Sequence, residues 1–272
     1  MTNTVFVVGL GPGGPQFLTA QAQSALTQAE VLCGYTVYLD LVRPYFPEKE
    51  YYSTGMTQEI DRCRWALETA RHGKVVALVC SGDAGVYGMA SPLLELAAQE
   101  APEDARCAHY LGREYLYRGM FRKAAEELKR HLTLPSAVWD EERAASMRYL
   151  SACMHALGDE RSAMCWAMRA IAEVPEQREN WYEAEKAAYR AENWEGVVYY
   201  GRKALRITTK SRSAINEAEA WGAAPWDLLS IGLWHTGDIR GAAEAASTAL
   251  SLCRSERIEA NLRLFQERLG EA

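Results

Sequence analysis

The chain has 272 residues, of which 49% are hydrophobic and 24% charged, as in a soluble protein long enough for two domains. Its net charge of −6 divides into −4 for residues 1–100 and −2 for the rest, which disfavours a nucleic-acid partner bound through its phosphates. No apolar run approaches the roughly 18 residues that cross a bilayer, and no basic segment precedes the first apolar run. We therefore expect a cytoplasmic protein with no membrane or nucleic-acid partner.

The seven cysteines contain no pair in CxxC spacing, and most lie in apolar runs: Cys33, Cys63, Cys80, Cys107, Cys153, Cys165 and Cys253. We expect reduced, buried thiols. The five histidines are scattered, and Cys153 and His155 alone stand close together. Two residues apart on a helix, they point to different faces, so we expect no metal site.

Short apolar runs alternate with helical stretches in the first hundred residues. The expected strands are Val5–Gly9, Val31–Gly34, Lys49–Tyr52 and Val75–Cys80, and the expected helices are Gln16–Ala29, Thr57–Arg71 and Pro92–Gln99. Continuous apolar strands between amphipathic helices predict a parallel sheet of about four strands, covered on both faces.

A glycine-rich loop, Gly9 to Pro15, follows the first strand and opens the first helix. Glycines let backbone amides approach a ligand closely, and a helix N-terminus favours negative charge. The alternative is a tight strand-to-helix turn. A dinucleotide site is disfavoured, because the second strand runs into Gly34 and Tyr35 instead of ending in the acidic residue that binds the ribose.

A second loop, Ser81 to Ala90, follows the Val75–Cys80 strand and contains three glycines and one acid, Asp83. Ligands of open parallel sheets bind beyond the carboxyl ends of the strands, so this loop is placed to wrap one. Asp83 is expected to face a hydroxyl or a cation, or else to cap the loop or the next helix.

These two loops, together with Gly34 to Asp40, resemble the tetrapyrrole methylase family, and within it the precorrin-3B C17-methyltransferases of cobalamin biosynthesis. The resemblance implies S-adenosylmethionine as cofactor and a tetrapyrrole partner, with methyl transfer by in-line displacement and no catalytic side chain that can be assigned. Tyr35 and Tyr38 would line the tetrapyrrole trough or serve as packing residues. The cofactor-binding residues that it implies are Gly9, Gly11, Pro12, Gly13, Gly82, Asp83, Val86 and Tyr87.

From about Glu103 the strand pattern ends and a helical repeat begins. Four copies of a turn followed by a helix start at Gly119, Gly158, Glu192 and Gly237, at intervals of 39, 34 and 45 residues. Such units cannot cover their own apolar faces, so they are expected to stack into a solenoid. We expect its aromatic side chains to pack between helices: Tyr115, Trp166, Trp181, Trp194, Tyr199, Trp221 and Trp234.

This second part resembles tetratricopeptide repeats, in particular the extension behind the catalytic domain of some bacterial glycosyltransferases. The similar stretches include Tyr110 to Leu116, Trp139 to Arg143, Arg169 to Glu173, Glu192 to Gly196 and Glu217 to Gly222. The resemblance implies a surface for a peptide or protein partner and no sugar-transfer chemistry.

The predicted fold class is α/β plus all-α: a truncated, parallel-sheet tetrapyrrole methylase first domain (residues 1–100) followed by a tetratricopeptide-like helical solenoid (residues 103–270). Pro102 is expected in the first turn of a new helix, so that the chain bends there. The junction removes the fifth strand and second domain that close over the cofactor in the family, and half a cleft buries too little of a ligand.

We therefore expect little or no methyl transfer. Three hypotheses remain open. The first is an engineered or rearranged chimera with residual cofactor affinity, the second is a pure interaction scaffold capped by the α/β part, and the third is a methyltransferase that is active as an oligomer.

Overall fold

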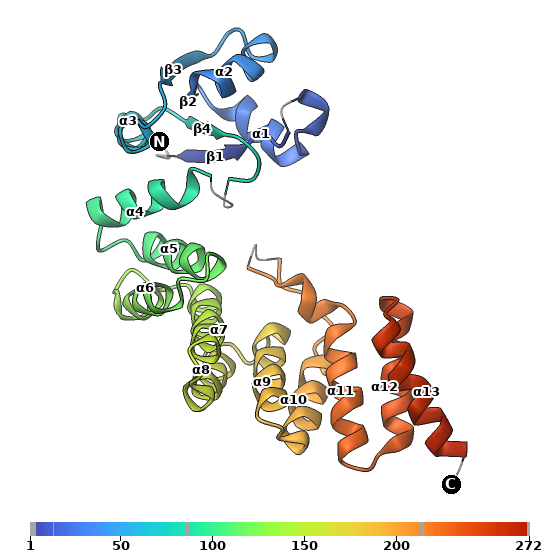
Figure 1. The fold of residues 1–272 in the computed structure, drawn as a ribbon. Coiled ribbons are helices and arrows are strands. Elements are labelled where there is room, and N and C mark those ends of the chain that lie inside the picture. The colour runs from blue at the N-terminus through green and yellow to red at the C-terminus, as the bar shows by residue number, and fades with distance from the viewer. Residues whose placement is uncertain (1–3, 13, 85–87, 213–214, 271–272) are drawn as a thin grey trace. The chain divides into compact units, whose positions relative to one another are not determined.

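The computed structural model describes residues 4–12, 14–84, 88–212 and 215–270 (Figure 1). The chain divides into two compact units, residues 1–120 and 121–272. The first unit joins a sheet and its covering helices to one further helix, and the second consists of helices. The boundary predicted at residues 100–103 marks where one family's sequence pattern gives way to another's. The division into compact units does not test it, so it stays a prediction.

The first unit contains a four-stranded parallel sheet in the order β1-β4-β2-β3. The strands are β1 (Val5–Gly9), β2 (Val31–Tyr35), β3 (Glu50–Thr54) and β4 (Val76–Cys80). Every residue of the central strand β4 is buried, as its continuous apolar run requires. The predicted parallel sheet is confirmed.

Helices cover both faces of this sheet. Helices α1 (Ala20–Gln28) and α2 (Thr36–Val42) pack on one face, and α3 (Glu59–Arg71) and α4 (Ala90–Glu100) pack on the other. The predicted helix from Gln16 starts late, because the Thr19 side chain accepts a hydrogen bond from the Ala22 amide (3.1 Å) and so caps α1. Helix α2 was not predicted from the sequence.

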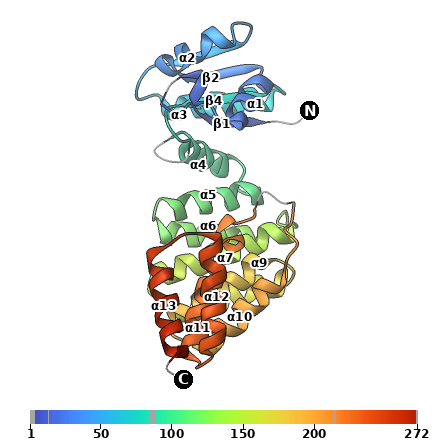
Figure 2. The same cartoon turned by 90° about the vertical axis from the view of Figure 1, so that its right-hand side faces the viewer.

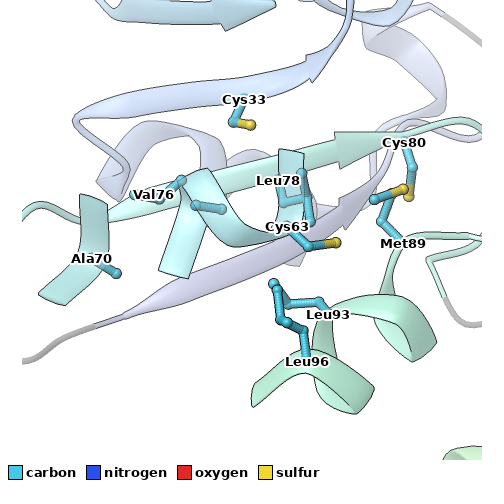
Figure 3. Close-up of a cluster of buried hydrophobic side chains, with 10 residues drawn as sticks. Cys33, Cys63, Ala70, Val76, Leu78, Cys80, Met89, Leu93 and Leu96 are labelled. Carbon is cyan, nitrogen blue, oxygen red and sulfur yellow. The ribbon is translucent and has the colours of Figure 1, made fainter. Parts of the chain in front are cut away.

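Three of the cysteines lie in the core between the sheet and α3 and α4, where Cys33, Cys63 and Cys80 pack with Leu78 and Leu93 (Figure 3). Burial raises the pKa of the Cys33 and Cys63 thiols to about 12, so both are protonated at neutral pH.

All seven cysteines lie in the described residues and are free. The prediction that they are buried is wrong for Cys165 and Cys253, which are exposed, and only partly right for Cys107. Cys165 lies on the exposed face of α8 and Cys253 follows the last residue of α12, and an apolar stretch of sequence does not reveal either position.

The helical structure is interrupted between α4 and α5 (Ala105–Tyr117), as predicted, but Pro102 does not lie in the new helix. Asp104 caps α5 instead, since its carboxylate accepts a hydrogen bond from the Cys107 amide (3.1 Å). The side-chain cap fixes the first helical residue at Ala105, three residues after Pro102.

The second unit is a series of helical hairpins (Figure 2). Consecutive helices pack together, and α9 also packs on α7 and on α11. A short 3-10 helix, η3 (Ala218–Trp221), precedes α11. The helices are α6 (Phe121–Thr133), α7 (Asp140–Ala156), α8 (Glu160–Glu173), α9 (Arg178–Arg190), α10 (Trp194–Arg206), α11 (Ala224–His235), α12 (Ile239–Leu252) and α13 (Glu256–Gly270).

The four predicted repeat anchors share one backbone conformation. Gly119, Gly158, Glu192 and Gly237 have φ angles of 71°, 82°, 53° and 87°. In each turn the following amide donates to a carbonyl five residues earlier, at 2.8 to 2.9 Å. This pattern ends a helix and reverses the chain, so the predicted repeat is confirmed at the level of individual hydrogen bonds.

Most repeat aromatics pack as predicted. Trp194 stacks on His235 with ring centroids 3.9 Å apart, and Trp234 stacks on Phe265 at 4.9 Å. Trp221 lies in η3 and packs on α9 through Arg178. The prediction is only partly right for Tyr199, which is 53% exposed and contacts Trp181 with ring centroids 6.4 Å apart.

Among the helices of the described ranges, none combines the length and the apolar character that a bilayer crossing requires.

Candidate functional site

The two glycine-rich loops lie side by side at the carboxyl ends of β1 and β4. Leu10 donates its amide to the Cys80 carbonyl at 3.0 Å, which extends the pairing of the two strands by one residue. Gly11 and Gly82 then exchange two backbone hydrogen bonds, at 3.1 and 3.2 Å, in an isolated antiparallel bridge. The loops predicted separately from the sequence are therefore one structure.

Glycine is required at several points of this structure. A Cβ atom on Gly9 would lie 2.3 Å from the Gly82 carbonyl oxygen, and one on Gly88 would lie 2.3 Å from that of Ala84. Gly11 and Gly82 have φ angles of 61° and 62°, in the left-handed region that favours glycine. A tight strand-to-helix turn alone would explain the left-handed conformation of Gly11, but it does not explain why the second loop approaches Gly9 so closely.

The loops diverge to opposite faces of the sheet. After β1 the chain continues to α1 on one face, and after β4 it continues to α4 on the other. Adjacent parallel strands whose following helices separate in this way form a topological switch point, where open α/β sheets bind ligands. The site therefore has the position expected of a ligand crevice.

A cavity of about 1160 Å³ opens at this point, between the loops, the edge of β1 and α1. Its walls include five residues predicted to bind the cofactor: Gly9, Gly11, Pro12, Gly82 and Asp83. The other three, Gly13, Val86 and Tyr87, lie outside the described residues.

Asp83 is exposed at the mouth of the second loop. It does not cap the next helix, since the described cap of α4 is Met89, which makes no side-chain cap bond. Asp83 is therefore not the N-cap residue of α4, and its capping of the loop stays a prediction. The charge of Asp83 acts on Glu114 of α5, whose pKa is raised chiefly by burial and further by Asp83, against the lowering effect of Arg113.

Arg62 is a structural support of the site that the sequence did not reveal. It is only 3% exposed, and it donates to Thr54 Oγ1 at 2.7 Å and to the Gly55 carbonyl at 3.1 Å. It also contacts Met89 Sδ at 3.7 Å, which ties the carboxyl end of β3 to the start of α4. In the sequence Arg62 is one of several charged residues of an amphipathic helix, so no local pattern predicts that its side chain is buried.

Tyr35 and Tyr38 pack edge to face, with ring centroids 5.5 Å apart, and Tyr38 lies against the core under α1 and α2. Their contacts are those of the packing residues considered in the sequence analysis. Among the described residues no group of three or more metal-ligating side chains lies close together.

Residues 4–106 match the family model of the tetrapyrrole (corrin/porphyrin) methylases. The chain is 46% identical over 94 residues to the probable cobalt-factor III C(17)-methyltransferase of Salmonella typhimurium, a stretch that covers 35% of this chain and 39% of that enzyme. The corresponding protein of Methanocaldococcus jannaschii is 42% identical over 94 residues, covering 35% and 36%. The resemblance predicted from the two loops is confirmed for this part of the chain, which spans about two fifths of the relatives' length.

The helical part is similar in fold to solved proteins of low sequence identity. The structure of MamA from Desulfovibrio magneticus, residues 41 to the end, superposes with a TM-score of 0.51 and 14% identity, covering 74% of this chain and 99% of that one. This likeness and the repeated turns bear out the tetratricopeptide-like fold, and they carry no information on partners.

Proposed function

We propose that the first unit binds S-adenosylmethionine or S-adenosylhomocysteine at the paired glycine loops and does not transfer methyl groups by itself. The observation that carries this proposal is the Gly11–Gly82 bridge at the switch point beside a cavity of about 1160 Å³. The loop backbone would lie against the ligand, and the Asp83 carboxylate would accept a hydrogen bond from a ribose hydroxyl.

In methyl transfer from this cofactor, a nucleophilic ring carbon of the tetrapyrrole forms a bond to the methyl carbon while the bond to the sulfonium sulfur breaks in line. The protein needs no nucleophilic side chain and contributes position and exclusion of water. Here the chain continues from α4 into α5 instead of a further strand, so the described part supplies one wall of the crevice. We expect this wall to hold the ligand weakly and to leave it open to water.

Calorimetric titration with S-adenosylhomocysteine tests the proposal. We expect measurable heat and a thermal shift, both lost in Asp83→Ala/Tyr87→Ala and both kept in Asp61→Ala, which removes an exposed aspartate on α3. No heat and no thermal shift at millimolar ligand would leave the α/β part as a structural cap, which is the scaffold alternative.

The oligomer alternative predicts methyl transfer to the tetrapyrrole that rises steeply with protein concentration, as a wall supplied by a second copy would require. Inactivity across the whole concentration range removes it.

For the second unit we propose a role in binding a protein or peptide. Buried polar side chains support this role, because Arg148 and Ser151 on α7 and Asn180 and Glu183 on α9 lie where these helices pack together. These side chains bond one another and Glu217, so a bound chain would be recognised by taking over some of these hydrogen bonds. Seven free thiols are consistent with a reducing, cytoplasmic setting.

A further inference from the structure

A short stretch of the chain lies against the shared face of α7 and α9. It consists of Ile215 to Trp221, just before α11 (orange in Figure 1), and is called the groove segment below. Its contacts with α7 join residues almost 70 positions apart: Glu217 binds Arg148 across 69 positions, and Ile215 does so across 67.

Arg148 is the centre of the first set of contacts. Its side chain is 2% exposed, and Nε donates to Glu217 Oε1 at 2.8 Å while Nη2 donates to the Ile215 carbonyl at 3.4 Å. Nη1 donates to Asn180 Oδ1 at 2.6 Å. The groove segment thus supplies the carboxylate that neutralises a cation buried in the α7–α9 face.

Trp221 is the centre of the second set. Its indole Nε1 donates to Glu179 Oε1 at 2.7 Å, and the Arg178 guanidinium lies 4.2 Å from its ring centroid. Both partners belong to the first turn of α9. A carboxylate and an aromatic side chain four residues apart therefore hold the segment at two points.

Between these points the segment makes further contacts with α9, including a hydrogen bond from Arg178 Nη1 to the Ala220 carbonyl at 3.5 Å. Ala220 is buried, whereas Ala218 and Glu219 are exposed. The Glu219 carboxylate accepts a hydrogen bond from the Tyr182 hydroxyl, and burial together with this carboxylate raises the pKa of Tyr182. Lys186, on the same face of α9, lies in the field of both Glu217 and Glu219. A partner chain that offers the same carboxylate and aromatic groups can exchange with these contacts, because protein hydrogen bonds are replaced by other hydrogen bonds when a segment is displaced.

Departure of the segment would leave Arg148 without its carboxylate. A buried cation without a partner is strongly disfavoured, so an empty α7–α9 face would select a ligand that brings a carboxylate. The same ligand gains from an aromatic group that can occupy the site of Trp221.

We propose that the groove segment is an intramolecular ligand, and that the α7–α9 face beneath it binds an extended acidic segment of a partner protein. The partner's carboxylate replaces Glu217 on Arg148, and an aromatic side chain four residues later replaces Trp221 on Arg178 and Glu179. This inference rests on the proposed binding role of the second unit and is independent of the cofactor loops.

The test uses the full-length chain and a fluorescein-labelled peptide with the sequence of residues 215–222, followed by fluorescence anisotropy. Glu217→Ala/Trp221→Ala weakens the tethered copy, whose local concentration is in the millimolar range, so we expect at least roughly tenfold tighter peptide binding than in the unsubstituted protein. Glu244→Ala, on the exposed face of α12, is the matched control and should leave binding unchanged.

A second arm changes only the peptide, so both peptides are compared on the same protein: replacing the peptide's first glutamate with glutamine removes the carboxylate that faces Arg148. We expect this peptide to bind at least roughly tenfold more weakly to the double variant, as loss of one charge-assisted contact implies. If the double variant keeps its circular dichroism spectrum and binds no more tightly than the unsubstituted protein, or if both peptides bind equally, the proposal is overturned.

A peptide-display selection on the double variant distinguishes the two levels of the argument. If the selected ligands bind the α7–α9 face and carry no carboxylate, the proposed acidic partner is wrong, although the second unit is still a binding module. Recovery of acidic peptides with an aromatic residue four positions later supports both.

Discussion

The turn between α9 and α10 contains the one repeat anchor that is not glycine, and its replacement should stabilise the protein. Glu192 has a φ angle of 53°, whereas Gly119, Gly158 and Gly237 occupy the same place in the other turns at 71° to 87°. A side chain in this left-handed region costs about 1–2 kcal/mol, because Cβ crowds the following carbonyl. Glycine avoids that cost but adds about 0.5–1 kcal/mol of chain entropy to the unfolded state.

The difference predicts that Glu192→Gly raises the free energy of unfolding by about 1 kcal/mol. Glu192 is exposed, so little packing is lost, and the Asn193 amide keeps its 2.9 Å bond to the Ala188 carbonyl. Urea denaturation followed by circular dichroism measures the change, with a shift in melting temperature of about 2–4 °C for a protein of this size.

Ala191→Gly is the matched control. Ala191 is the exposed neighbour of Glu192 with an ordinary φ of −84°, so glycine there should destabilise by about 0.5–1 kcal/mol. Equal effects of the two substitutions, or a loss of stability in Glu192→Gly, would refute the argument from backbone strain.

Two further predictions concern buried groups. Burial, followed by the charge of Asp227, raises the pKa of Glu185 well above its ordinary value of 4.5. The folded state therefore keeps the Glu185 proton at pH values where the unfolded chain has lost it. The free energy of unfolding consequently falls as the pH rises above about 4.5. Glu185→Gln should thus raise the melting temperature at pH 8 and change it little at pH 4, and a gain of equal size at both pH values in differential scanning calorimetry would contradict this. Gly9→Ala places a Cβ 2.3 Å from the Gly82 carbonyl oxygen and should separate the loops, with loss of S-adenosylhomocysteine binding by calorimetry. Gly55→Ala, where the nearest contact is 3.6 Å, should keep that binding, and binding by Gly9→Ala equal to that of the unsubstituted protein would show that the bridge does not form the site.

Features that depend on neighbouring residues were predictable from the sequence. Continuous apolar runs predicted the parallel sheet, and the spacing of Gly119, Gly158, Glu192 and Gly237 predicted the helical turns, including the position where glutamate stands in a glycine conformation. The two glycine loops were predictable as well, because close backbone approach requires glycine whatever lies around it. Helix boundaries were less so, since the caps at Thr19 and Asp104 compete with other candidates nearby.

Features that depend on partners far along the chain were decided only by tertiary structure. The pairing of Gly11 with Gly82 follows from the insertion of β4 beside β1, and Arg62 becomes a support of the site only when α3 packs over the sheet. The contact of Arg148 with Glu217 spans 69 residues, and no local pattern marks either side chain. The sequence by itself determined which backbone conformations and elements form, because these depend on local sterics and on the period of apolar residues. Which charges are buried together was decided by packing, because a charge can be placed in the interior only where the fold brings its partner.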